Sequence, residues 1–241
     1  MRKDIHNSDI PELCRSCEAR HKGVCGALTP SQLTALAKHT TRKQLPSGTE
    51  LIASEEPVTN YASIMSGVVK LSKLLIDGRQ QIVGLKFAPD FLGRPLKDTS
   101  RITAEAATAV KLCSFPKTVL ERMMAEAPGL ERRLLEQTLK ELDEAREWMV
   151  TLGRKTAQEK VASFLYLIAL HADPELEDDD RDNTSFDLPL TRSDIADFLG
   201  LTIETVSRQL TRLRLDNIIR IEHSRHITVP SLERLLDRCG D

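Results

Sequence analysis

The stretch from Leu188 to Arg214 constrains the fold most, because it has the pattern of two short helices joined by a tight turn. Thr191 and Asp194 have the spacing of a capping box, with Asp in place of the usual Glu. Gly200 suits the turn and Thr202 suits the cap of the second helix. The apolar side chains expected to face inward are Ile195, Ala196, Phe198 and Leu199, then Ile203, Val206, Leu210 and Leu213. The stretch therefore predicts a helix-turn-helix.

Three polar residues share the opposite face of the second helix, Glu204, Ser207 and Arg208, at spacing i, i+3 and i+4. A recognition helix presents its first turns to base edges in the major groove. Arginine can donate two hydrogen bonds to guanine, glutamate can accept from cytosine, and serine can bond a base or a phosphate. The alternative is a surface helix with ordinary polar residues. The capped turn favours a reader of double-stranded DNA.

Two short strands are predicted beyond this helix, at 217–222 and 225–229, around a turn at His223-Ser224. Such a hairpin is a wing that can lie against the DNA backbone. A short helix at 231–238 would close the domain, and an apolar helix at 157–171 would form part of its core. The C-terminal part therefore reads as a winged helix-turn-helix.

The net charge of −2 does not suit a nucleic-acid binder, which favours a basic surface. However, residues 173–182 hold seven acids and one arginine, a local charge of −6. Residues 208–226 hold five arginines and two acids, a local charge of +3. The predicted DNA-reading part is thus locally basic. We expect 173–185 to be a solvated loop without a function.

The length of 241 residues suits two domains that each bury a core. The chain contains no run of about 18 apolar residues, so no membrane span is expected. The first residues lack the apolar centre of a signal peptide. We therefore expect a cytoplasmic protein without membrane contact.

Short β-rich runs separated by turn residues fill 45–115, after one helix at 29–40. Asp77-Gly78 between two runs is a strong hairpin signal. The runs are 50–54, 61–66, 68–76, 81–87, 102–106 and 109–115. This texture predicts a small barrel or roll.

Helical periodicity returns after Pro116, with a short helix at 117–125 that ends near Pro128 and a long one at about 130–155. The long helix carries an a/d seam of about three heptads. Its predicted dimer-interface residues are Leu135, Leu142, Ala145, Met149 and Leu152, with Thr138 also in the seam.

The seam could instead pack on its own domain, but the charged exterior of the helix favours pairing in a homodimer. A two-fold dimer suits a reader of paired half-sites. We expect the acidic side chains of Glu141, Glu144 and Glu147 to oppose pairing, which helps make it reversible.

Four of the five cysteines form a candidate metal site. Cys14, Cys17 and Cys25 follow a C-x₂-C-x₇-C pattern, and Cys113 lies in the strand-rich part. Four thiolates suit zinc or an iron–sulfur cluster, and their spacing does not decide between these. A structural zinc usually uses two C-x₂-C pairs, whereas this chain has one. The cysteines could also be unrelated, and Cys239 is expected to be incidental.

The sequence contains no phosphate-binding glycine loop, no Ser/His/Asp motif and no HExxH motif. An iron–sulfur enzyme would leave the ETVSR sequence at 204–208, with its polar face, unexplained. We therefore expect a regulator and not an enzyme.

These features resemble the CRP/FNR superfamily of bacterial transcription regulators, in particular its oxygen-responsive fumarate–nitrate reduction (FNR) branch. The resemblance rests on ETVSR at 204–208, on SGVVKLSKLLIDGRQQIVGLKFAPDFLG at 66–93 and on the four cysteines. It implies an α+β fold with a cyclic-nucleotide-binding-like β-roll, a dimerisation helix and a winged helix-turn-helix. The implied divisions are 1–28 for cluster binding, 29–128 for the β-roll sensor, 129–156 for dimerisation and 157–241 for DNA binding.

The resemblance also implies roles for particular residues. Glu204, Ser207 and Arg208 would read a TTGAT-type half-site, and a [4Fe–4S] cluster would promote dimerisation until oxygen removes it. The implied cluster ligands are Cys14, Cys17, Cys25 and Cys113. RNA polymerase is an expected partner, with the turn 77–79 as a candidate contact. A zinc site or a thiol-redox switch remains the alternative trigger.

Two departures from the family pattern stand out. The gap between Cys17 and Cys25 is longer than in the best-known members, which requires a roomier loop. The stretch 91–96 reads FLGRPL, with Arg94 where the cyclic-nucleotide cassette needs an acid. Binding of a cyclic nucleotide is therefore not expected.

Overall fold

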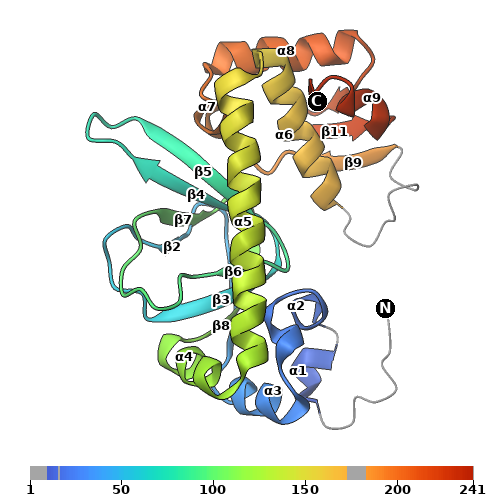
Figure 1. The fold of residues 1–241 in the computed structure, drawn as a ribbon. Helices are drawn as coiled ribbons and strands as arrows, with labels where there is room; N and C mark the ends of the chain where they lie inside the picture. Colours follow the sequence, from blue (N-terminus) through green and yellow to red (C-terminus); the bar gives the residue numbers. More distant parts are fainter. Residues whose placement is uncertain (1–9, 16, 173–182, 241) are drawn as a thin grey trace. The chain divides into compact units, whose positions relative to one another are not determined.

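The computed structural model describes residues 10–15, 17–172 and 183–240. The chain divides into two compact units, Met1–Leu142 and Asp143–Asp241, and the long helix α5 (Pro128–Arg154) belongs partly to each (Figure 1). Sheets and helices occur in both units, which confirms the predicted α+β class. None of the described helices is long and apolar enough to cross a membrane.

The first unit contains two four-stranded antiparallel sheets, with strand orders β1-β8-β3-β6 and β2-β7-β4-β5 (Figure 1). Their apolar side chains, among them Ile64, Val69 and Leu112, pack in one buried cluster. The strands are β1 (Thr41–Leu45), β2 (Glu50–Ile52), β3 (Asn60–Ser66), β4 (Val69–Leu74), β5 (Gln80–Lys86), β6 (Phe91–Leu92), β7 (Thr103–Ala106) and β8 (Val110–Pro116). The predicted roll is confirmed.

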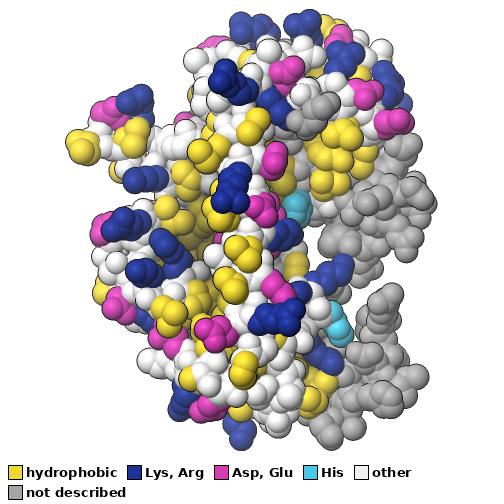
Figure 2. All heavy atoms as spheres, viewed as in Figure 1, with side chains coloured by type: hydrophobic (Ala, Val, Ile, Leu, Met, Phe, Trp, Pro, Cys, Tyr) yellow, Lys and Arg dark blue, Asp and Glu magenta, His cyan; other side chains and the backbone are white. Residues whose placement is uncertain are grey.

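The Asp77-Gly78 hairpin joins β4 to β5 as predicted. Gly78 has a φ of +85°, and the Leu75 N–H donates to the Arg79 carbonyl over 2.8 Å. Ile76 at the tip is fully exposed, and the hydrophobic and charged side chains of this hairpin project at the left of Figure 2. Strands β1 and β6 were not predicted, because β1 is polar with mostly exposed side chains and β6 has only two residues.

The cysteine segment, whose sequence shows no clear helical or strand period, contains three short helices: α1 (Glu12–Arg15), α2 (Glu18–His21) and the 3₁₀ helix η1 (Val24–Ala27). The predicted helix that follows is α3 (Pro30–Ala37), which begins with a capping box between Thr29 and Gln32. Its neighbour in the fold is α4 (Lys117–Glu126). One buried cluster joins Ile10, Val24 and Leu28 of the cysteine segment to α3, α4 and the start of α5.

Helix α5 begins at Pro128, earlier than predicted, because proline fits the first turn of a helix. Leu130 and Leu134 are buried in the first unit. Exposed apolar side chains follow along the helix, and Figure 2 shows them among charged ones. Their exposed fractions are 58% for Leu135, 51% for Leu139, 44% for Leu142, 72% for Met149 and 53% for Val150.

Glu141, which was predicted to repel the paired helix, has a charged partner within its own chain. Its carboxylate forms an ion pair with the ammonium group of Lys86 on β5, whose side chain is buried. The pair satisfies the buried lysine charge, which is costly without a partner. The ion pair offsets part of the Glu141 charge, whereas Glu144 and Glu147 are exposed, and the opposition of all three to pairing stays a prediction.

The second unit contains α6 (Ala157–Ala172), α7 (Arg192–Leu199), α8 (Ile203–Leu215), α9 (Leu232–Leu236) and a three-stranded antiparallel sheet of order β10-β11-β9. The strands are β9 (Thr184–Asp187), β10 (Arg220–Glu222) and β11 (His226–Val229). Strand β9 corrects part of the loop predicted at 173–185, because Thr184 and Phe186 alternate inward and pair with β11. Residues 173–182 lie outside the described residues.

Candidate DNA-reading surface and cysteine cavity

The local hydrogen bonds of the helix-turn-helix are those the sequence predicts. The Asp194 N–H donates to the Thr191 hydroxyl and the Thr191 N–H donates to the Asp194 carboxylate, each over 3.1 Å. Gly200 ends α7 with a left-handed φ of 62°. The Thr205 N–H then donates to the hydroxyl of Thr202 over 3.2 Å. Both caps and the glycine turn are confirmed, and together they fix the start of α8.

The apolar faces of α7 and α8 are buried with one exception. Val206, Leu210 and Leu213 are at most 2% exposed, whereas Ile203 is 45% exposed. The prediction that Ile203 faces inward is wrong. Helical side chains lean toward the N-terminus, so this first residue of α8 extends past the packed part of the helix.

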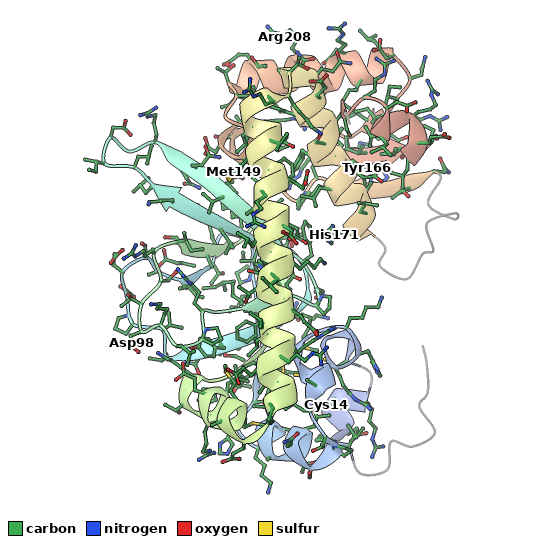
Figure 3. The ribbon with its side chains drawn as sticks, viewed as in Figure 1. Cys14, Asp98, Met149, Tyr166, His171 and Arg208 are labelled. Carbon is green, nitrogen blue, oxygen red and sulfur yellow. The ribbon has the colours of Figure 1, made fainter. Side chains whose placement is uncertain are left out.

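Glu204, Ser207 and Arg208 are all exposed on α8, and Figure 3 shows Arg208 at the outer surface of this helix. A hydrogen bond from its own backbone N–H, and another from Thr202, lower the pKa of Glu204 below its usual range. This carboxylate is therefore an ionised acceptor near neutral pH. A guanidinium N–H of Arg208 donates to the Thr205 hydroxyl over 3.4 Å. The face thus offers an acceptor carboxylate, a donor guanidinium and a hydroxyl that can do either, and its role in reading bases stays a prediction.

The wing is formed by β10 and β11, and its turn has left-handed φ values of 47° at His223 and 67° at Ser224. Arg192 at the start of α7 donates to the Ser224 carbonyl over 2.9 Å. Burial, and then the neighbouring charge of Arg225, lower the pKa of Arg192. Sequence reasoning missed Arg192, because only the folded wing brings it against a turn 32 residues away.

The four predicted metal ligands line one cavity of about 140 Å³. Cys14 lies in α1, Cys17 precedes α2, Cys25 lies in η1 and Cys113 lies in β8. The long gap between Cys17 and Cys25 is filled by α2 and the start of η1, which explains this departure from the family pattern. No disulfide joins the five cysteines. The fold therefore brings together thiols from two distant parts of the sequence.

Two of the four thiols strongly disfavour negative charge by themselves. Burial, followed by the other three cysteines, raises the pKa of Cys25 to about 12. Burial and the thiols of Cys17 and Cys14 raise the pKa of Cys113 to about 11, with Arg42 acting in the opposite direction. Four thiolates could therefore share this cavity only with added positive charge, as a bound metal group supplies.

Strand register places two further side chains in the same cavity. Cys113 on β8 lies between Arg42 on β1 and Ser63 on β3, directly opposite each. Sequence reasoning missed both residues, because the pairing of these strands cannot be read from one sequence. Among the described residues, no three His, Cys, Asp or Glu side chains gather closely enough for a single metal ion.

Residues 91–96, which correspond to the cyclic-nucleotide cassette, form hydrogen bonds and close contacts with Tyr61 and Glu121. The Tyr61 hydroxyl donates to the Glu121 carboxylate over 2.9 Å, and the Arg94 carbonyl lies 3.2 Å from the same hydroxyl. A side chain at Gly93 would meet the Tyr61 ring at 2.3 Å. A cavity of about 570 Å³ lies between this segment and α5. The expectation that it binds no cyclic nucleotide stays a prediction.

Known proteins match this chain along most of its length. Residues 42–127 match the cyclic nucleotide-binding domain and residues 159–238 the Crp-like helix-turn-helix domain. A "Probable transcriptional activator" of Rhizobium leguminosarum bv. viciae is 55% identical, over 97% of this chain and 96% of the relative. Transcriptional activator protein FnrL of Cereibacter sphaeroides is 41% identical, over 95% of this chain and 92% of FnrL.

A solved structure, that of FixK2 from Bradyrhizobium japonicum, has a TM-score of 0.72 and 33% identity, over 83% of this chain and 96% of that chain. The relatives are DNA-binding transcription regulators and not enzymes, as the sequence predicted, and such regulators are typically dimeric. The chain belongs to the CRP/FNR superfamily of transcription regulators and is a DNA-binding activator of its FNR/FixK group.

Proposed function

We propose that this activator responds to oxygen through a [4Fe–4S] cluster held by Cys14, Cys17, Cys25 and Cys113. With the cluster present, two chains pair along α5 and bind a palindromic TTGAT-type site. Oxygen removes the cluster and binding is lost. The observation that carries this proposal is the single cavity that all four cysteines line, although Cys113 is far from the others in sequence.

The cavity suits a charged group of several atoms. Its four thiols surround a volume of about 140 Å³, which is more than one bare ion requires. Burial and the neighbouring thiol of Cys17 raise the pKa of Cys14, while the positive charges of Arg42 and Arg20 act in the opposite direction. When bound, the cluster would supply the oxygen-sensitive chemistry, because its iron and sulfide are open to oxidation. The protein supplies thiolates, neighbouring positive charge and burial.

The cysteine segment also contacts the helix proposed to form the dimer. Arg133 in α5 donates to the Lys22 carbonyl over 2.6 Å. Val24 and Leu28 share a buried cluster with Leu130 and Leu134. A change in the segment would therefore disturb the first turns of α5 through packed side chains and a direct hydrogen bond.

Pairing would cover the exposed seam residues of α5. Two-fold symmetry would then place two copies of α8 about one DNA turn apart. Moving such an equilibrium from 1:99 to 99:1 needs about 5.5 kcal/mol of differential stabilisation. Four metal–thiolate bonds can meet that demand, because a structural zinc ion in a zinc-finger peptide already contributes about 10–16 kcal/mol of binding free energy.

The decisive experiment uses protein purified without oxygen. Its visible spectrum, iron and acid-labile sulfide contents, molecular mass and affinity for a TTGAT palindrome are measured before and after exposure to air. We expect about four irons per chain, as four thiolates suit a [4Fe–4S] cluster, and air should remove colour, dimer and tight DNA binding together. A colourless protein with zinc, or one whose binding follows dithiol oxidation alone, would favour the zinc site or the thiol-redox switch.

Replacing Arg208 by Ala tests the proposed reading of bases. The loss of a two-bond contact to guanine should cost about 1–3 kcal/mol of discrimination between the intact half-site and one altered at that base. Competition titrations with both DNA duplexes measure this difference. Arg220→Ala on the wing is the matched control, expected to weaken both duplexes equally. Unchanged discrimination in the Arg208 variant would exclude this side chain from base reading.

The tip of the β4–β5 hairpin is the proposed contact with RNA polymerase. Its turn presents the charged pair Asp77 and Arg79, joined over 2.7 Å, beside the fully exposed Ile76. Leu74 and Leu75 are also exposed beside it, and a contiguous exposed apolar patch rimmed by charges marks a protein contact surface.

A further inference from the structure

The cysteine cavity contains a buried hydroxyl group that forms no hydrogen bond with the described residues. Ser63 is 1% exposed and lines the cavity together with the four cysteines. Its residue lies directly opposite Cys113 in the antiparallel pair of β3 and β8. The Ser63 hydroxyl finds no hydrogen-bond partner among the described residues. Buried hydroxyls nearly always have one, so this exception calls for a physical reason.

Nearby hydroxyls do have partners within the protein. Thr40, which also lines the cavity, donates to the Leu36 carbonyl over 2.8 Å. Ser114 is adjacent to Cys113 but does not line this cavity, and it donates to the Tyr61 carbonyl over 3.4 Å. Ser63 thus differs from these two hydroxyls, because it places a donor without a hydrogen bond in a cavity lined by four cysteines.

We propose that Ser63 tunes the reduction potential of the cluster, because its hydroxyl donates a hydrogen bond to a sulfur atom of the bound group. This inference rests on the proposed [4Fe–4S] site and adds a residue that is not one of its ligands. A hydrogen bond to a sulfur withdraws electron density from it, and such bonds tune the reduction potential of iron–sulfur clusters. Ser63 would therefore make the cluster harder to oxidise and slow its loss in air.

The test compares full-length wild-type protein with Ser63→Ala, each prepared without oxygen and assayed with and without its cluster. In the loaded protein, loss of the donor should lower the midpoint potential by about 40 mV, the equivalent of a fivefold change in a one-electron equilibrium. Bleaching in air should be faster by a similar factor. In the apoprotein, the same change removes an unsatisfied buried hydroxyl, so the melting temperature should stay the same or rise.

Ser114→Ala is the matched control, because it deletes a hydroxyl from the neighbouring strand that already has a backbone acceptor. It should leave the midpoint potential and the bleaching rate unchanged. Iron content is measured for every variant, so that failure to assemble the cluster is separated from an altered cluster.

Three outcomes would overturn the inference. If loaded Ser63→Ala has the wild-type potential and bleaching rate, Ser63 does not contact the cluster, while the proposed function stands. If Ser63→Ala destabilises the apoprotein more than Ser114→Ala does, its hydroxyl has a structural role. If the wild-type protein assembles no cluster, the inference fails together with the proposed function, and the iron analysis identifies that case.

Discussion

Replacing Cys17 by Ala should reduce the iron bound by anaerobically purified protein from about four atoms per chain to nearly none. The thiol is 8% exposed and lines the cavity with three others, so its loss leaves one iron without a protein ligand. Without the cluster, α5 should stay unpaired and transcription of target genes under low oxygen should fall to the uninduced level. Iron analysis and a promoter–reporter assay measure the two effects.

Cys239→Ala provides the control, because this cysteine is also buried but lies in the second unit. Its thiol donates to the Leu235 carbonyl over 3.4 Å. The control should keep full iron content and full anaerobic activation. If Cys17→Ala activates normally in anaerobic cells, the cluster mechanism is wrong, and a zinc or thiol-based trigger has to be considered.

Replacing Met149 by Glu should break the proposed dimer without unfolding the chain. Met149 is 72% exposed and projects from α5 in Figure 3, so the free energy of unfolding should change by no more than about 0.5 kcal/mol. In a paired seam the new carboxylate would be buried without a partner, which costs about 3–5 kcal/mol. The dimer dissociation constant should therefore rise by more than about 100-fold.

Sedimentation of cluster-loaded protein measures this dissociation constant, and titration with a full palindrome and a single half-site measures its consequence. Binding to the palindrome should fall to the level of the half-site. Lys140→Glu adds the same side chain to the same helix outside the predicted seam, and it should leave the mass unchanged. If the Met149 variant remains a dimer at wild-type affinity, α5 does not pair through this seam.

Local signals made the DNA-reading unit predictable. Caps at Thr191 and Thr202 and the glycine turn at Gly200 act within a few residues, so one sequence shows them. The errors concern positions that depend on tertiary packing. Ile203 fits the apolar period but extends past the packed core, and β9 exists because β11 is beside it.

For the same reason, the sequence predicted the four cysteines of the candidate site but not the other side chains that line it. Cysteine spacing and family resemblance singled out the four thiols, since thiols are rare enough to stand out. Ser63 and Arg42 are common residue types, and only strand pairing brings them to Cys113. A single sequence carries the alternation along a strand but not its register against a distant partner.

The register around Cys113 has a consequence for how related chains can differ in length. The segment between Cys17 and Cys25 can absorb inserted residues at the turn after α2, where Lys22 is exposed, because surface turns tolerate added length. Strand β8 has no such freedom, because side chains alternate between its two faces. One residue inserted between Val110 and Cys113 would turn the thiol away from the cavity. Among homologues, a deletion or insertion in β8 should therefore be a better sign of a lost sensor than a changed gap between the N-terminal cysteines.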